Sequence, residues 1–270
     1  MDIIKECATA LKSVKEKKPL IHNITNYVTV NDCANIILAI GGSPIMADES
    51  NEVEEMVSIS SCLVINMGTL NERTVSSMLK AGKKANLLHK PVVFDPVGVG
   101  AGSYRNRIAA KLLNEIEFAV IRGNMSEIKS LSGLAVQTKG VDSVADEAGG
   151  AEAARGFAAE MNCVVAVTGQ TDIITDGQRV CLIENGHPML KTVTGTGCMT
   201  TALVGTYCGA APDYFVAASA GVATMGLAGE LAKKALQENE GVGTFRMRLF
   251  DSIYNLTEET IRKEGRMKIE

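Results

Sequence analysis

The stretch Thr194-Gly195-Thr196-Gly197-Cys198 is the most informative part of the chain, and an apolar helical run, Met199–Gly205, follows it directly. Its two glycines allow the backbone to turn tightly and to approach a ligand closely. The amides that open the helix direct free N–H groups, together with the positive end of the helix dipole, into the turn. The stretch therefore predicts an anion site, although small residues can also open a helix simply for packing.

The length and composition of the chain predict one α/β domain, residues 1–270. The net charge is −4 and the basic residues are scattered, so nucleic acid is not an expected partner. The start of the chain, Met1–Glu6, lacks the pattern of a secretory signal. Because the seven cysteines include no C-x-x-C pair, we expect reduced thiols and a cytoplasmic location.

A nearly uncharged segment, Thr192–Gly229, carries Asp213 as its sole charge. The segment is rich in Gly, Ala, Thr and Ser and is interrupted by Pro212, so it lacks the apolar character of a bilayer span. We expect two closely packed interior helices here, and no membrane contact.

Short apolar runs alternate with stretches of helical periodicity along most of the chain. Helices are expected over residues 2–16 and near 29–40, 51–60, 71–88, 103–116, 124–133, 143–161, 198–209, 214–238 and 245–263. Strands are expected at Leu20-Ile21, Pro44–Met46, Cys62–Ile65, Pro91–Phe94, Phe118–Ile121 and Val164–Val167, and a β-hairpin over 172–183. Since β-branched runs between helices are typical of parallel sheets covered on both faces, we predict an α/β fold with a mainly parallel central sheet flanked by helices.

Polar side chains follow the ends of the predicted strands. They are His22-Asn23, Asn66, Asp95, Arg122-Gly123-Asn124 and Thr168. Parallel strands place their carboxyl ends at one edge of the sheet, where open α/β folds bind ligands. These side chains are therefore expected to gather beside the anion-binding turn, although any one of them can be a loop cap.

Several blocks of the chain resemble the hydroxyethylthiazole kinase family of the ribokinase-like superfamily. Asn124-Met125-Ser126-Glu127 matches the Asn-x-x-Glu motif of that superfamily, and the 195–198 turn is similar to its anion hole. The blocks that resemble the thiazole kinases themselves are His22–Thr29, Pro44–Ala47, Asp95–Gly100 and Gly195–Met199. The resemblance spans residues 11 to about 250. It implies a ribokinase-like fold and phosphorylation of the hydroxyl of 4-methyl-5-(2-hydroxyethyl)thiazole with ATP and Mg²⁺, in thiamine biosynthesis or salvage.

The resemblance also implies roles for the polar residues at the sheet edge. Arg122, Thr168 and Asn124 are expected to bind ATP, and a guanidinium fork suits phosphate oxygens. Asp95 and Glu127 are expected to hold Mg²⁺, which prefers oxygen ligands and needs only one or two carboxylates. From the residues alone, Glu127 can equally be an acid that the helix dipole favours in a first turn.

Cys198 stands where most of the wider superfamily carries Asp as the general base, and the thiazole kinases that this chain resembles also carry Cys there. A helix N-terminus lowers the pKa of a thiol, so some thiolate is expected at neutral pH. We hypothesise that Cys198 orients the attacking hydroxyl and accepts its proton, while the backbone of Gly195, Thr196 and Gly197 stabilises the transferred group. A small buried thiol that only fills space is the alternative.

The thiazole pocket is expected to be mainly apolar with a few polar anchors. The resemblance assigns Met46 and Gly195 to it, whereas position alone makes Met46 a core residue. Asn23 and Asn26 are further candidates, and either can instead fix its loop. His22 and His187 are expected to be structural, because no second histidine or cysteine lies at metal-ligand spacing.

The resemblance further implies a homotrimer with active sites at subunit boundaries. Three other functions stay open: an ADP-dependent dehydratase of hydrated nicotinamide cofactors, a pyrimidine kinase of thiamine synthesis, and a sensor that has lost turnover. The dehydratase would carry Asp in place of Cys198, and the pyrimidine kinase would lack the block that begins at His22. A Rossmann oxidoreductase is not expected, because no G-x-G-x-x-G follows the first strand.

Overall fold

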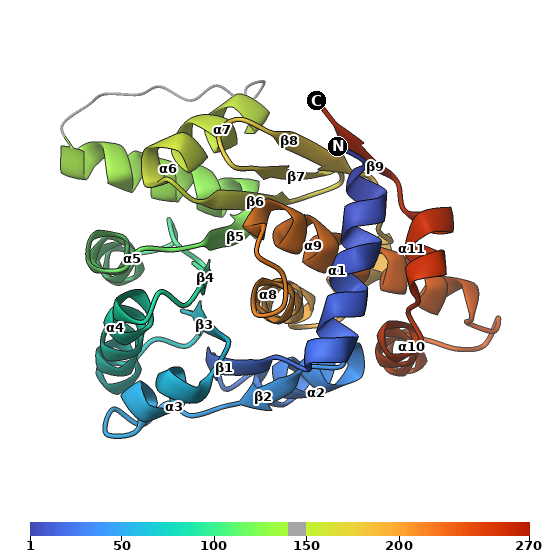
Figure 1. Cartoon of the computed structure of the whole chain (residues 1–270), viewed down its shortest axis with the longest axis horizontal. Coiled ribbons are helices and arrows are strands. Elements are labelled where there is room, and N and C mark those ends of the chain that lie inside the picture. The colour runs from blue at the N-terminus through green and yellow to red at the C-terminus, as the bar shows by residue number, and fades with distance from the viewer. Residues whose placement is uncertain (140–149) are drawn as a thin grey trace.

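The computed structural model describes residues 1–139 and 150–270, and in it a central sheet is covered by helices on both faces (Figure 1). The described strands are β1 (Leu20–Ile24), β2 (Ser43–Ile45), β3 (Cys62–Asn66), β4 (Val92–Asp95), β5 (Val120–Asn124), β6 (Val164–Thr168), β7 (Asp172–Thr175), β8 (Val180–Ile183) and β9 (Met267–Ile269). They lie in the order β2-β1-β3-β4-β5-β6-β7-β8-β9. The first six are parallel and the last three antiparallel, which confirms the predicted α/β class and the hairpin.

The helices form two layers, and each layer has its own core. The described helices are α1 (Ile3–Lys17), α2 (Val30–Ile40), α3 (Val53–Ile59), α4 (Glu72–Leu87), α5 (Ser103–Glu115), α6 (Met125–Lys139), α7 (Gly150–Met161), α8 (Thr196–Cys208), α9 (Tyr214–Lys234), α10 (Val242–Tyr254) and α11 (Glu258–Glu264), with a 3₁₀ turn η2 (Pro188–Thr192). Buried side chains of α3–α7 pack on one face of the sheet, and those of α1, α2 and α8–α11 pack on the other. Burying apolar area on both faces is what stabilises a parallel sheet.

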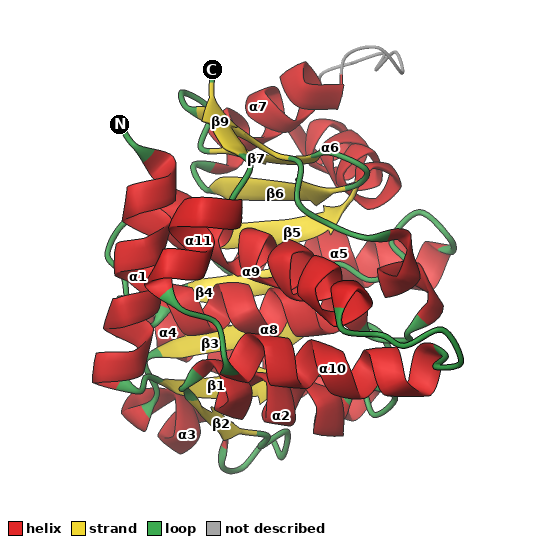
Figure 2. Cartoon of the chain, turned by 90° about the vertical axis from the view of Figure 1, so that its right-hand side faces the viewer, coloured by secondary structure: helices red, strands yellow, loops and turns green. Residues whose placement is uncertain are grey.

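One prediction about the C-terminal part is wrong, and one strand there was not predicted. The single helix expected near 245–263 is two helices, α10 and α11, because Thr257 caps a new helix: its hydroxyl accepts a hydrogen bond from Thr260 N at 3.1 Å. The short strand β9, which the sequence did not indicate, pairs with β8 at the sheet edge (Figure 2). The predicted helix over 143–161 is observed from Gly150, and its first residues, 143–149, lie outside the described residues.

The uncharged segment forms the interior helices α8 and α9, as predicted. Their contact is close: a Cβ on Gly221 of α9 would lie 2.7 Å from the Cα of Val204 on α8, so only glycine fits. Within the described part of the chain, α9 is long and apolar enough to cross a membrane, but 89% of that apolar window is buried inside the fold. It is a core helix, and it holds α8 against the sheet so that the N-terminus of α8 faces the strand ends.

Candidate active site

The turn before α8 has the conformation that its glycines predict. Gly195 adopts φ +86° as the N-cap of α8, and a Cβ there would lie 2.5 Å from Thr29 Cγ2. In the described part of the chain, no hydrogen bond engages the backbone N–H groups of Thr196, Gly197 or Cys198. Three free N–H groups at the positive end of a helix dipole form an anion site.

Replacing Gly195 with alanine is expected to damage this site and the fold together. The left-handed φ and the clash with Thr29 should lower the free energy of unfolding by about 1–3 kcal/mol. Displacement of the turn should lower kcat by about 10²-fold. Urea denaturation and steady-state turnover measure the two effects.

Gly133→Ala is the matched control. Gly133 lies within α6, its φ is not in the left-handed range, and a Cβ there would meet nothing within 4 Å. Gly133→Ala should keep its turnover and be no less stable than the wild type, since alanine favours a helix. Unchanged stability and turnover in Gly195→Ala would contradict the described turn.

Arg122 lies directly above the anion turn. Its Nη2 donates to Thr168 Oγ1 at 2.5 Å, its Nη1 lies 3.6 Å from Asp95 Oδ2, and 11% of its side chain is exposed. A Cβ on Gly197 would lie 2.9 Å from Arg122 Nη1, so the missing side chain makes room for the guanidinium. The guanidinium of Arg122 thus lies next to the free N–H groups of the turn, and phosphate oxygens can bind to the guanidinium and to the N–H groups together.

Asp95, at the end of β4, is completely buried. Its Oδ2 accepts hydrogen bonds from Asn66 Nδ2 at 3.0 Å and Thr201 Oγ1 at 2.7 Å, whereas its Oδ1 has no partner among the described residues. Burial raises the pKa of Asp95 to about 6, although Arg122 opposes that shift. A buried carboxylate oxygen without a partner is costly, so a cation or donor is expected to meet it when ligands bind.

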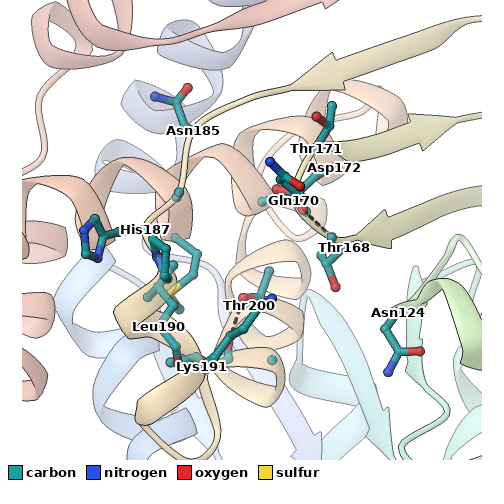
Figure 3. A pocket seen from close by; sticks show the side chains of 18 of the residues that line it. Asn124, Thr168, Gln170, Thr171, Asp172, Asn185, His187, Leu190, Lys191 and Thr200 are labelled. Atoms are coloured by element: carbon teal, nitrogen blue, oxygen red, sulfur yellow. Dashed lines mark hydrogen bonds between the residues drawn. The ribbon is translucent and has the colours of Figure 1, made fainter. Parts of the chain in front are cut away.

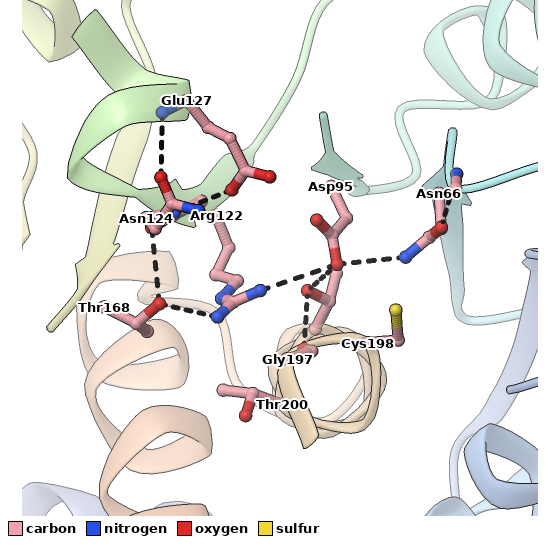
Figure 4. Close-up of polar contacts among 12 residues, drawn as sticks. Asn66, Asp95, Arg122, Asn124, Glu127, Thr168, Gly197, Cys198 and Thr200 are labelled. Carbon is pink, nitrogen blue, oxygen red and sulfur yellow. Dashed lines mark hydrogen bonds and ion pairs between the residues drawn. The ribbon is translucent and has the colours of Figure 1, made fainter. Parts of the chain in front are cut away.

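The Asn-x-x-Glu motif closes on itself at the start of α6 (Figure 4). Asn124 Oδ1 accepts from Glu127 N at 2.9 Å, and Glu127 Oε2 accepts from Asn124 N at 2.8 Å. Glu127 Oε1 also accepts from Gly98 N at 2.9 Å. This reciprocal pattern is a capping box, so the motif positions the helix and the loop after β4 in addition to any ligand role. Within the described ranges, each carboxylate oxygen of Glu127 accepts one backbone hydrogen bond.

Cys198 differs from expectation in its ionisation. Cys198 is the third residue of α8, and its Sγ accepts a hydrogen bond from Asn26 Nδ2 at 3.3 Å. Burial, followed by the charge of Asp95, raises the pKa of the Cys198 thiol. This shift runs against the predicted partial thiolate, because burial disfavours the charged form of the thiol. Among the seven cysteines it is the one that is not fully buried.

A cavity of about 840 Å³ opens on one side of the anion turn (Figure 3). Its lining includes Arg122, Asn124, Thr168, Thr196 and Gly197, which unites the three predicted ATP residues with the anion turn. It also includes residues that sequence reasoning missed: Gln170, Asp172, Lys191 and Thr200. The sequence offered little indication of these residues, because none of them lies directly at the end of a parallel strand. They lie at the hairpin, on η2 and one turn into α8.

The predicted thiazole residues do not line this cavity. Those on or just after strands lie toward the β2 edge of the sheet. Met46 follows β2 directly and is partly buried, Asn23 is buried within β1, and Asn26 is buried just after it. In the sheet, β2 and β1 are separated from β5 and β6 by β3 and β4. Figure 4 correspondingly shows Cys198 on one side of the start of α8 and Thr168 on the other.

The two histidines that were expected to be structural make backbone contacts. His22 is buried, and its Nε2 lies 2.8 Å from Ala47 O. His187 Nδ1 accepts from Met189 N at 3.2 Å and so caps η2, although His187 also lines the cavity. No group of three or more His, Cys, Asp or Glu within the described ranges is arranged to hold a metal.

Comparison with known proteins places this geometry in a family. The profile of the hydroxyethylthiazole kinase family matches residues 11–259. A hydroxyethylthiazole kinase of Clostridium beijerinckii is 55% identical over 263 residues, which cover 96% of this chain and 95% of that protein. The corresponding protein of Alkaliphilus oremlandii is 51% identical, with 99% of each chain covered.

Solved structures agree with the sequence match. A hydroxyethylthiazole kinase protein from Pyrococcus horikoshii superimposes with a TM-score of 0.88 at 38% identity, covering 98% of each chain. A pyridoxal kinase from Staphylococcus aureus, solved with AMP-PCP, gives 0.63 at 15% identity over 94% of this chain and 98% of that one, a likeness of fold alone. The predicted ribokinase-like fold is confirmed. On the strength of the family profile and these relatives, the chain belongs to the hydroxyethylthiazole kinase family.

Proposed function

We propose that the protein transfers the γ-phosphoryl group of ATP to the hydroxyl of 4-methyl-5-(2-hydroxyethyl)thiazole, giving 4-methyl-5-(2-phosphooxyethyl)thiazole for thiamine diphosphate synthesis or salvage. The observation that carries the proposal is the family match along residues 11–259. The geometry supports it, because phosphoryl transfer needs positioning and charge neutralisation at a single point. Arg122 lies beside Gly197 of the turn, and its Nη1 is 3.6 Å from Asp95 Oδ2.

ATP is assigned to the 840 Å³ cavity. Arg122 and Thr168, already hydrogen-bonded to each other, would present a guanidinium and a hydroxyl to the phosphates, and Asn124 lies at the same rim. The γ-phosphate would then reach the N–H groups of Thr196, Gly197 and Cys198. Those donors stabilise the negative charge that spreads over the phosphoryl oxygens during transfer.

Asp95 and Glu127 fit a magnesium ion. Asp95 contributes a buried oxygen without a partner among the described residues, and each oxygen of Glu127 accepts a single hydrogen bond from that same part of the chain. Two carboxylates suffice, because Mg²⁺ usually completes its shell with water and substrate phosphates. When bound, Mg²⁺ supplies positive charge that offsets the charge of the transferring phosphate.

The acceptor thiazole is assigned to the opposite side of the turn. Met46 would provide a soft apolar contact, and Gly195 is assigned to the same pocket through the family resemblance, although Thr29 fills the space that its side chain would take. Asn23 Oδ1 has no partner among the described residues and is available to a donor, whereas Asn26 is occupied by Thr29, Asn66 and Cys198. The hydroxyl would approach the γ-phosphate beside Cys198.

Replacing Cys198 tests its part in proton removal. With its pKa raised, the thiol is a poor base at neutral pH, and a loose transition state needs little base. Cys198→Ala should therefore lower kcat by about tenfold, less than a strong base contributes, and Cys198→Asp should retain turnover. Cys163→Ala is the control, because it replaces a buried thiol in the core that α3–α7 form on the other face of the sheet. Wild-type kcat in Cys198→Ala would end the base hypothesis.

A coupled assay tests the proposed function directly. Purified protein with Mg²⁺ and ATP is given either hydroxyethylthiazole or hydroxymethylpyrimidine, and ADP release is followed. We expect turnover with the thiazole. Turnover with the pyrimidine alone would replace the substrate assignment, and no turnover with either would favour a sensor.

The remaining proposals concern organisation. We propose that residues 1–270 form a single ribokinase-like domain, that the protein acts in the cytoplasm, and that it assembles as a homotrimer with active sites at subunit interfaces. Exposed apolar side chains near the thiazole side, Tyr27 and Val28, support an interface there. Light scattering should then give three times the chain mass of 28.6 kDa, and the monomer mass would contradict the assembly.

A further inference from the structure

A chain of buried hydrogen bonds connects the thiol of Cys198 to the carboxylate of Asp95. Asn26 Nδ2 donates to Cys198 Sγ at 3.3 Å and to Asn66 Oδ1 at 3.0 Å. Asn66 Nδ2 then donates to Asp95 Oδ2 at 3.0 Å. Both asparagines are buried, with 4% and 2% of Asn26 and Asn66 exposed. The chain crosses from the proposed acceptor side to the proposed phosphate side.

The direction of this chain is fixed by backbone N–H groups, which can only donate. Gly68 N donates to Asn66 Oδ1 at 2.9 Å, and Thr29 N donates to Asn26 Oδ1 at 3.1 Å. Each amide oxygen is thereby identified, so each amide nitrogen must face the next acceptor in the chain. If either amide were flipped, its NH₂ group would face a backbone N–H donor in a buried place. A buried donor would then be left without an acceptor, and the free energy cost of its desolvation would not be recovered.

We propose that Asn66 is a positioning residue that ties the acceptor side of the active site to the phosphate side through Asn26 and Asp95. Its amide accepts from Asn26, a neighbour of Cys198, and donates to the buried carboxylate of Asp95. It thereby holds the sulfur of Cys198 in place relative to the carboxylate of Asp95. The catalytic consequence rests on the proposed kinase function, whereas the placement of the thiol does not.

Two variants separate this role from general folding. Asn66→Asp keeps the shape but cannot donate to Asp95 as a carboxylate, and it adds a charge beside it. Asn66→Ser shortens the side chain without adding charge, so it decides the question if Asn66→Asp does not fold. Asn71→Asp is the matched control, because Asn71 uses its oxygen to accept from Thr74 N at the start of α4, a cap that Asp also provides.

The measurements are kcat, the KM for ATP, and the rate at which iodoacetamide alkylates Cys198 at pH 8. The other six cysteines are buried, so alkylation of the native protein reports on Cys198. We expect kcat to fall about 10²-fold in Asn66→Asp and about tenfold in Asn66→Ser, while the KM for ATP changes less than about threefold. Alkylation should slow in both, more in Asn66→Asp, since the amides of Asn66 and Asn26 both act to lower the pKa of the Cys198 thiol and an added carboxylate would raise it.

The control should match the wild type in all three measurements. Wild-type kcat and alkylation in a folded Asn66 variant would overturn the proposal, and so would a lower kcat with unchanged alkylation, which would indicate a merely structural role. If the wild type does not phosphorylate the thiazole, the proposed function fails, and the alkylation rates still test the placement of the thiol.

Discussion

Asp95→Asn is expected to lower kcat by about 10³-fold while the protein stays folded. The substitution keeps the acceptor oxygen for Asn66 and Thr201 but removes the buried charge that is assigned to Mg²⁺. A charge that acts in a dry site contributes on this scale to the stabilisation of a transition state. Steady-state kinetics at saturating ATP measure the loss. Asp48→Asn, which alters an exposed ion pair with Arg73, is the control and should keep wild-type kcat.

The same variant has a predicted pH signature in stability. Burial holds the pKa of Asp95 near 6 in the folded protein, above its ordinary value of 3.8. The folded state therefore binds a proton more tightly than the unfolded state, so the Asp95 contribution to stability falls as the pH rises from about 4 to about 6. The free energy of unfolding of the wild type minus that of Asp95→Asn should decrease over this range and then level off. A difference that rises across it would contradict the burial of the charge.

Arg122→Ala is expected to lower kcat/KM for ATP by about 10²–10³-fold. Arg122 is the cation held beside Gly197 and hydrogen-bonded to Thr168, so its loss removes both charge and fork geometry from the phosphates. Arg122→Lys should recover only part of the loss, because an ammonium cannot bond two oxygens in a plane. Arg73→Ala removes an exposed arginine and should leave kcat/KM unchanged. Full activity in Arg122→Ala would remove Arg122 from the site.

The convergence of the site was predictable because it follows from one rule about parallel sheets. Asp95, Arg122 and Thr168 each end an apolar run, and parallel strands bring such ends to one edge. The two glycines of the turn could also be recognised from the sequence. Gly195 adopts a positive φ, and the missing side chain of Gly197 leaves space for Arg122. Both features depend on local sequence and a simple topology.

Other features depend on long-range packing and escaped prediction. The pKa of Cys198 is raised by burial, and the depth of burial is decided by helices far along the chain. Asn66 lies 40 positions after Asn26 and 29 positions before Asp95 in the sequence. No local sequence pattern therefore contains the hydrogen bonds that link these three residues. Strand β9 has only three residues, and its partner β8 lies more than 80 residues earlier in the chain. The break between α10 and α11 did have a local signal, the capping Thr257.

The central claim is that ATP and the acceptor alcohol meet from opposite sides at the N–H groups of residues 196–198. A crystal structure with Mg²⁺, a non-hydrolysable ATP analogue and hydroxyethylthiazole tests it most directly. We predict the γ-phosphate within hydrogen-bond distance of Gly197 N and Cys198 N, with Arg122 on the nucleotide side and the thiazole hydroxyl beside Cys198 Sγ. A γ-phosphate bound away from this turn, or a thiazole in the same cavity as the adenine, would contradict the account.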